Sequence, residues 1–159
     1  MTHDDIQALN QQFLHATPEK VLMYLLEHYK DKVCLASSLG AEDQVLTHMF
    51  CQLTGSPCIF VLDTGRFHQE TYNVMEKTQR QYAFNYRVFF PKTESVQDMV
   101  SEHGPNHFYA SLQARKDCCF IRKVEPLQRA LAGYDVWITG LRRAQSIDRA
   151  SAQLFEWDT

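Results

Sequence analysis

Short apolar runs alternate with helix-like segments along most of this 159-residue chain. The strand-like runs are apolar and bounded by small or polar residues, and they cover 32–37, 58–62, 86–90 and 136–139. Helical patterns follow them at about 42–53, 69–81, 93–102 and 119–132. Alternating strands and helices predict an α/β fold in which a parallel sheet is flanked by helices. Two helices within 1–30 and a fifth short strand at 153–157 complete the prediction.

The size of the chain predicts a single domain. With 159 residues and 45% apolar content, residues 1–159 suffice for one core, with helices in 1–30 and the sheet in 32–159. Because no run of about 18 apolar residues occurs and the first residues form no basic leader, we expect a cytoplasmic protein without a membrane segment. Thiols are normally reduced in that compartment.

The loop after the first predicted strand resembles an anion cradle. Ser37–Asp43 combines hydroxyl groups, a glycine and the start of a helix, whose unpaired N–H groups attract negative charge. It has neither the Walker pattern nor the glycine pattern of dinucleotide-binding folds. A turn that binds nothing would have a similar sequence, so this loop alone leaves both interpretations open.

Two further loops end at the same edge of the predicted sheet, where open α/β sheets bind ligands. Residues 62–65 supply a carboxylate, a hydroxyl and a glycine that could contact a base or ribose, although Asp63 could instead cap the next helix. Residues 140–149 contain Arg142 and Arg143, whose guanidinium groups suit bidentate binding of phosphate or sulfate. Together the loops predict a site for a small anion.

Positive charge is concentrated late in the chain. The net charge is −3, yet residues 115–149 hold eight Lys/Arg against four Asp/Glu. These cations form no stripe interleaved with aromatic residues, and the acidic remainder would repel a long polyanion, so we expect no nucleic-acid partner. For Arg115, Lys116 and Arg129 a solvated helix face is the alternative.

Cys118 and Cys119 are adjacent and are followed closely by Arg122 and Lys123. Soft thiolate ligands beside fixed positive charge are what an iron–sulfur cluster next to an anionic substrate requires. Such a cluster usually takes four thiolates. The other cysteines have apolar neighbours and are expected in the core, at Cys34, Cys51 and Cys58. The chain therefore carries half of a cluster site.

Four segments together resemble the assimilatory adenylyl-sulfate and phosphoadenylyl-sulfate reductases: Ser37–Asp43, Leu62–Tyr72, Cys118–Leu127 and Thr139–Ser146. The resemblance implies a Rossmann-like sheet of the adenine nucleotide alpha-hydrolase type. It also implies a thioredoxin- or glutaredoxin-dependent oxidoreductase of sulfate assimilation and cysteine biosynthesis, which reduces the activated sulfate to sulfite and AMP. The cysteine pair resembles that of one branch of this family. That branch carries a [4Fe-4S] cluster and takes adenosine 5′-phosphosulfate rather than 3′-phosphoadenosine 5′-phosphosulfate.

The resemblance also implies roles for individual residues. The substrate-binding positions would be Ser37, Ser38, Leu39, Gly40, Glu42, Asp43, Leu62, Asp63, Thr64, Gly65, Lys123, Gly140, Arg142, Arg143 and Arg149. Lys123 would act electrostatically between the substrate and the cluster, and Cys118 and Cys119 would be metal ligands. The first loop would wrap the phosphosulfate, and the second would contact the adenosine.

Members of this family continue past Thr159, where they carry a second cysteine pair and the nucleophilic cysteine. We therefore expect residues 1–159 to form the nucleotide-binding part, inactive alone, with the cluster absent or incomplete. A homo-oligomer that pools Cys118 and Cys119 from two copies is an alternative for the cluster. An ATP pyrophosphatase-type adenylating enzyme and a non-catalytic nucleotide-binding remnant or sensor are alternatives for the function.

Overall fold

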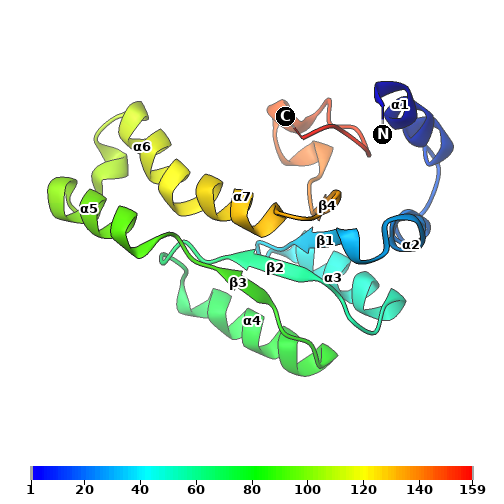
Figure 1. Ribbon diagram of the computed structural model, residues 1–159, viewed down its shortest axis with the longest axis horizontal. Helices are drawn as coiled ribbons and strands as arrows, with labels where there is room; N and C mark the ends of the chain where they lie inside the picture. Colours follow the sequence, from blue (N-terminus) through cyan, green and yellow to red (C-terminus); the bar gives the residue numbers. More distant parts are fainter. Residues whose placement is uncertain (1, 159) are drawn as a thin grey trace.

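The sheet extends from its first strand in two directions. β1 (Val33–Ala36) lies between β2 (Ile59–Leu62) and β4 (Val136–Thr139), and β3 (Arg87–Phe89) lies outside β2. The strand order in the computed structural model is thus β3-β2-β1-β4 (Figure 1). Every neighbouring pair is parallel. The predicted parallel α/β sheet is confirmed.

Helices connect the strands and precede them. In residues 2–158, which the structure describes apart from the side chain at position 148, the α-helices are α1 (His3–Gln12), α2 (Pro18–Tyr29), α3 (Ala41–Leu53), α4 (Gln69–Tyr82), α5 (Thr93–His103), α6 (Leu112–Cys119) and α7 (Glu125–Leu131). Short 3₁₀ turns cover Lys30–Lys32, His107–Tyr109, Arg143–Gln145 and Ile147–Arg149. Within the described residues, no helix has the length and apolar character needed to cross a bilayer.

The two faces of the sheet are covered by different helices, because successive strand side chains point to opposite sides. Leu35 and Val61 join Phe50 of α3 in the larger core. Cys34 and Phe60 pack against α7 on the other face. Figure 1 shows α3 and α4 on one side of the sheet and α7 on the other. The sheet thus lies between two layers of helices.

The helix that carries the cysteine pair begins earlier than predicted. It starts at Leu112 rather than at residue 119, because the Ser111 hydroxyl accepts a hydrogen bond from the N–H of Ala114 (3.0 Å) and caps it. A π-helical segment, Phe120–Val124, then joins α6 to α7. The predicted boundary was wrong because the polar stretch before the cysteines shows no clear apolar period.

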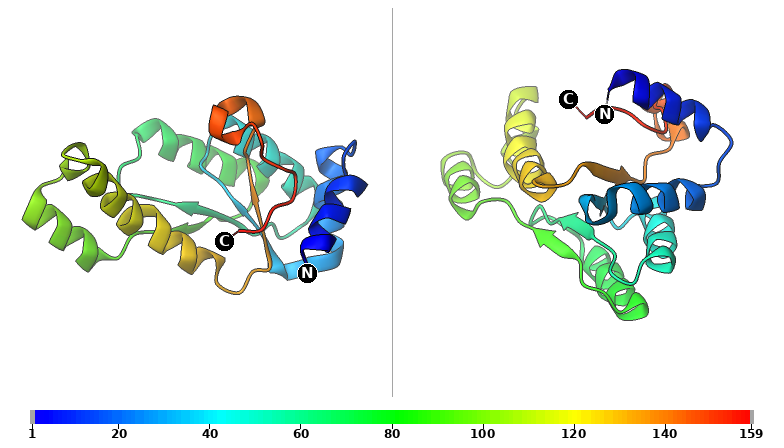
Figure 2. Two further views of the ribbon diagram at one scale, coloured as in Figure 1. Left: turned by 90° about the horizontal axis from the view of Figure 1, so that it is seen from above. Right: turned by 45° about the vertical axis from the view of Figure 1, so that its right-hand side comes forward.

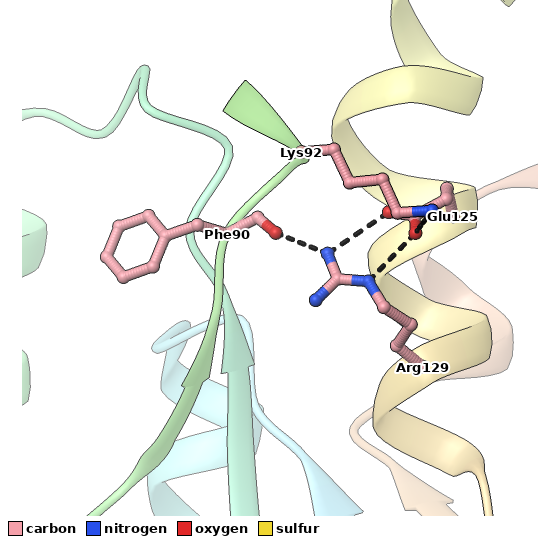
Figure 3. Close-up of polar contacts among 4 residues, drawn as sticks. All are labelled: Phe90, Lys92, Glu125 and Arg129. Atoms are coloured by element: carbon pink, nitrogen blue, oxygen red, sulfur yellow. Dashed lines mark hydrogen bonds and ion pairs between the residues drawn. The ribbon is translucent and has the colours of Figure 1, made fainter. Parts of the chain in front are cut away.

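Polar contacts fasten α7 to the edge of the sheet. The Arg129 guanidinium donates hydrogen bonds to the Glu125 carboxylate (2.8 and 3.1 Å) and to the carbonyl of Phe90, just after β3 (Figure 3). Lys92 lies 3.3 Å from the same carboxylate. Hydrogen bonds from Arg129 hold the pKa of Glu125 below its ordinary value, with a smaller contribution from Lys92. Arg129 thus has a structural role.

The predicted fifth strand is wrong: residues 153–157, all within the described part of the chain, contain no strand. This segment lies beside α1, and Figures 1 and 2 show the two ends of the chain close together. The Asn10 side chain donates to the Phe155 carbonyl (2.8 Å) and accepts from the Phe155 N–H (3.0 Å). One amide side chain therefore satisfies both backbone groups that a neighbouring strand would have paired.

Replacing Asn10 with Ala should release the terminal segment. The substitution removes both hydrogen bonds to Phe155, so we expect a loss of about 1–3 kcal/mol in the free energy of unfolding and faster amide exchange at residues 153–157. Denaturant unfolding and hydrogen exchange would measure these effects. Gln11→Ala, on the exposed side of the same helix, is the control. Equal effects of the two substitutions would contradict this account.

Candidate functional site

The candidate site lies where the strand order reverses. The chain moves from β1 through β2 to β3 on one side, and β4 then pairs with the other side of β1. Crevices outside the carboxyl ends of strands at such a switch point bind ligands in open α/β sheets. The loops that follow β1 and β4 meet at this point. A Cβ atom on Gly140 would lie 2.1 Å from the Asp43 Oδ1 atom, so the backbone of one loop packs directly on the other.

Asp43 braces the loop after β1 from within. Its Oδ2 atom accepts hydrogen bonds from the Ser38 N–H (2.7 Å) and the Ser38 hydroxyl (2.5 Å). The side chain is only 6% exposed. The neighbouring Ser37 hydroxyl accepts from the N–H of Leu39 (3.1 Å). The structure therefore gives Asp43 a supporting position beneath the loop.

The turn in this loop is made by Leu39 rather than by the glycine. Leu39 has a φ of +64°, whereas Gly40 has an ordinary extended φ of −72°. A left-handed conformation costs a residue with a side chain roughly 1–2 kcal/mol. The Leu39 side chain is 7% exposed and lies in the larger core, which offsets that cost. The sequence gives no sign that Leu39, rather than the neighbouring glycine, adopts the left-handed conformation.

The loop after β1 ends at the start of α3, where the first backbone N–H groups of the helix lie. The helix begins at Ala41, and its N-cap residue, Gly40, offers no side-chain hydrogen bond to the first turn. Uncapped N–H groups and the helix dipole make such a terminus attractive to an anion. The helix spans thirteen residues. Earlier in the loop, the N–H groups of Ser38, Leu39 and Gly40 donate to side chains of the loop itself, so anion binding at this loop stays a prediction that depends on the start of α3.

The loop after β2 is braced by Asp63, which is 2% exposed. Its carboxylate accepts hydrogen bonds from the Gly65 N–H (2.8 Å) and from the Tyr72 hydroxyl of α4 (2.8 Å). The hydrogen bond to Asp63 raises the pKa of Tyr72 above its ordinary value. Asp63 therefore fixes its own turn and is joined to α4 through the Tyr72 side chain, while the N-cap residue of α4, His68, accepts no side-chain cap hydrogen bond. Leu62 and Thr64 flank it at the strand end.

Arg122 joins the cysteine-pair segment to this second loop. Its side chain is buried, and its Nη1 atom donates to the Thr64 carbonyl (2.6 Å). Its Nε atom is buried without a hydrogen-bond partner among the described residues. The next residue, Lys123, is exposed. Sequence reasoning noted the charge of Arg122 but not this contact, because the π-helical turn that positions the side chain has no sequence signal that the chain reveals.

The three arginines of the last loop have different partners. Arg142 reaches the first loop and pairs with Glu42 at 2.6 Å. Arg143 donates to the Ala152 carbonyl (2.6 Å), and Arg149 donates to the Gln145 side chain. The pKa of Glu42 lies below its ordinary value, because the Glu42 carboxylate accepts hydrogen bonds from its own backbone N–H, from Gln145 and from Arg142. Of the three, only Arg142 is joined directly to the loop after β1 in this structure.

The cysteine pair supplies two adjacent thiols with different surroundings. Cys118 is buried and Cys119 is exposed. Among residues 2–158, no group of three or more His, Cys, Asp or Glu side chains is placed to hold a metal ion. A [4Fe-4S] cluster takes four thiolates. The described residues by themselves therefore do not form a complete cluster site.

Comparisons with known proteins identify the family of this chain. Residues 32–159 match the phosphoadenosine phosphosulfate reductase domain. An adenosine 5′-phosphosulfate reductase of Burkholderia cepacia is 47% identical over 128 residues, which cover 80% of this chain and 51% of the relative. The enzyme of the same name from Allochromatium vinosum is 44% identical over 128 residues, which cover 80% of this chain and 50% of the relative. The chain thus spans about half the length of these curated relatives.

A solved structure shares the fold. The crystal structure of phosphoadenylyl-sulfate reductase from Candida auris, a phosphate complex, superposes with a TM-score of 0.77 and 23% identity. The match covers 89% of this chain and 69% of that chain. The sheet and its flanking helices therefore have the adenine nucleotide alpha-hydrolase-like architecture.

Gly140→Ala tests the contact between the loops after β1 and β4. The new methyl group would collide with Asp43, so we expect a loss of about 1–3 kcal/mol in the free energy of unfolding, as for other overpacked sites. Gly55→Ala is the matched control, because a Cβ atom at Gly55 meets nothing within 4 Å. Its effect should stay within about 0.5 kcal/mol. Similar unfolding free energies for the two variants would show that the loops do not pack this closely.

Proposed function

Because this chain belongs to the phosphoadenosine phosphosulfate reductase domain family, we propose that it forms the nucleotide-binding part of an adenosine 5′-phosphosulfate reductase. The enzyme would reduce the activated sulfate to sulfite and AMP in cytoplasmic sulfate assimilation, with thioredoxin or glutaredoxin as the reductant. The names of the 44–47% identical relatives support this substrate. The contact of Gly140 with Asp43 carries the proposal, because it brings two anion-binding loops together at the switch point.

In this proposal the first loop and the start of α3 bind the phosphosulfate. The backbone N–H of Ala41, at the start of α3, would donate to its oxygens, and Arg142 would add a guanidinium group from the facing loop. Glu42 holds the Arg142 Nε atom at 2.8 Å and would orient it. Asp43 would act through Ser38, which it positions, rather than by touching the anion.

The adenosine would lie against the loop after β2. Leu62 and Thr64 would contact it at the strand end, while Asp63 keeps Gly65 and the turn in place. The backbone of Gly140 would contact the nucleotide from the other side. Arg143 and Arg149 would reach the anion by exchanging their present hydrogen bonds for contacts with substrate oxygens.

Cys118 and Cys119 are proposed as two of the four thiolate ligands of a [4Fe-4S] cluster in the complete enzyme, with Lys123 between them and the substrate. The remaining two ligands would come from outside the described residues, either from a second copy of the chain or from another polypeptide segment. The buried Arg122 would hold this cysteine segment against the adenosine loop through the Thr64 carbonyl.

Anaerobic calorimetric titration of this chain with adenosine 5′-phosphosulfate tests the proposal. We expect saturable binding that prefers this compound to 3′-phosphoadenosine 5′-phosphosulfate and to ATP. Preference for ATP would favour an ATP pyrophosphatase-type enzyme instead. Absence of binding to all three nucleotides would contradict an intact nucleotide site.

Arg142→Ala should weaken this binding by about 10- to 100-fold, because it removes charge-assisted hydrogen bonds to the anion. Arg80→Ala is the matched control. Arg80 is also exposed and paired with a glutamate, Glu76, at 2.6 Å, but it lies on α4. The affinity of the Arg80→Ala variant for adenosine 5′-phosphosulfate should match that of the unmodified chain. An equal effect of the two substitutions would remove Arg142 from the site.

A further inference from the structure

A groove runs along the opposite edge of the sheet and is not used by the proposed function. Its volume is about 810 Å³. Residues at the amino ends of three strands line it, namely Cys58 before β2, Arg87 at the start of β3 and Tyr134 before β4. The nucleotide loops follow the carboxyl ends of the strands, so the two regions are separated by the length of the sheet.

Cys58, Tyr134 and Arg87 form a connected cluster in this groove. The Cys58 Sγ atom lies 2.9 Å from the Tyr134 hydroxyl and 4.0 Å from the Arg87 Nη1 atom. The same Nη1 atom donates a hydrogen bond to the Tyr134 oxygen. Because a guanidinium group can only donate, the tyrosine oxygen accepts from Arg87 and its own proton is left to point at the sulfur.

The tyrosine keeps that proton at neutral pH. Burial and the hydrogen bond to Cys58 raise the pKa of Tyr134 to about 12. A thiolate on Cys58 would therefore receive one hydrogen bond from a phenol and one from a cation. Reactive cysteines occur in such partly exposed, electropositive surroundings, since the thiolate is the nucleophilic form.

Two other cysteines lack these surroundings. Cys34 is fully buried, and burial raises its pKa to about 12. Cys51 is half-buried like Cys58, but burial alone raises its pKa. Cys51 thus offers an internal reference with similar exposure and no cation beside the sulfur.

We propose that Cys58 is a reactive thiol, modified by hydroperoxides that enter this groove. The sulfur attacks one peroxide oxygen, the O–O bond breaks, and the sulfur is oxidised to a sulfenic acid. The peroxide is reduced to water or an alcohol, which takes up the thiol proton. The site is independent of nucleotide binding, so a failure of either proposal leaves the other standing.

The test exposes the reduced chain to hydrogen peroxide, traps sulfenic acids with dimedone, and locates the adducts by tandem mass spectrometry. We expect Cys58 to be labelled about tenfold faster than Cys51, because a guanidinium group lies 4.0 Å from the Cys58 sulfur and reactive thiols occur in such electropositive surroundings. Equal rates for Cys58 and Cys51 would overturn the proposal.

Two substitutions identify the cause. Arg87→Met should slow labelling of Cys58 about tenfold while leaving Cys51 and the exposed Cys119 unchanged, and Arg80→Met on α4 is the matched control. Tyr134→Phe retains the aromatic ring but removes the hydroxyl that donates to the Cys58 sulfur, so it should also slow the labelling of Cys58. Circular dichroism would establish folding. If Arg87→Met does not fold, Tyr134→Phe and the rates in the unmodified chain decide. Unchanged labelling of Cys58 in folded variants would overturn the proposal.

Discussion

The candidate site depends on one buried carboxylate. Asp43 lies on the first turn of α3, holds the loop after β1 through Ser38, and supports the backbone of the loop after β4 at Gly140. A charged group is costly to bury unless hydrogen bonds compensate it. The two donors of Ser38 provide that compensation, so loop shape and carboxylate burial depend on each other. The glycine is required because any side chain there would displace Asp43.

A second pair of elements is coupled in a similar way. The π-helical turn buries Arg122 beside the loop after β2, and the Thr64 carbonyl receives its hydrogen bond. The exposed Lys123 follows immediately. A π-helical turn inserts an extra residue into a helix and is frequent at functional sites. Any movement of the cysteine pair would therefore be transmitted to the loop proposed to contact the adenosine.

The sequence predicted the parallel sheet and the three loops because each strand is a short apolar run that ends at small or polar residues. It did not reveal what those polar residues contact. Asp63 proved to brace its own turn, Arg143 binds the Ala152 carbonyl, and Arg149 binds Gln145 of its own loop rather than the loop after β1. Such pairings depend on side chains that the fold brings together from distant positions. Residues 153–157 were wrongly predicted as a strand for the same reason. The Asn10 side chain, distant in the sequence, instead makes the hydrogen bonds to the backbone of Phe155.

The contact of Arg129 with Phe90 has a further consequence for how copies of this chain meet. β3 is one of the two outer strands of the sheet, and outer strands expose backbone groups that can pair with another molecule and cause aggregation. Here the strand is short, begins with a charged arginine and is followed closely by Pro91. Arg129 donates a hydrogen bond to the carbonyl of Phe90, just beyond the end of the strand. α7, the helix that follows the cysteine-pair segment, thus helps to keep this edge of the sheet from pairing with another molecule.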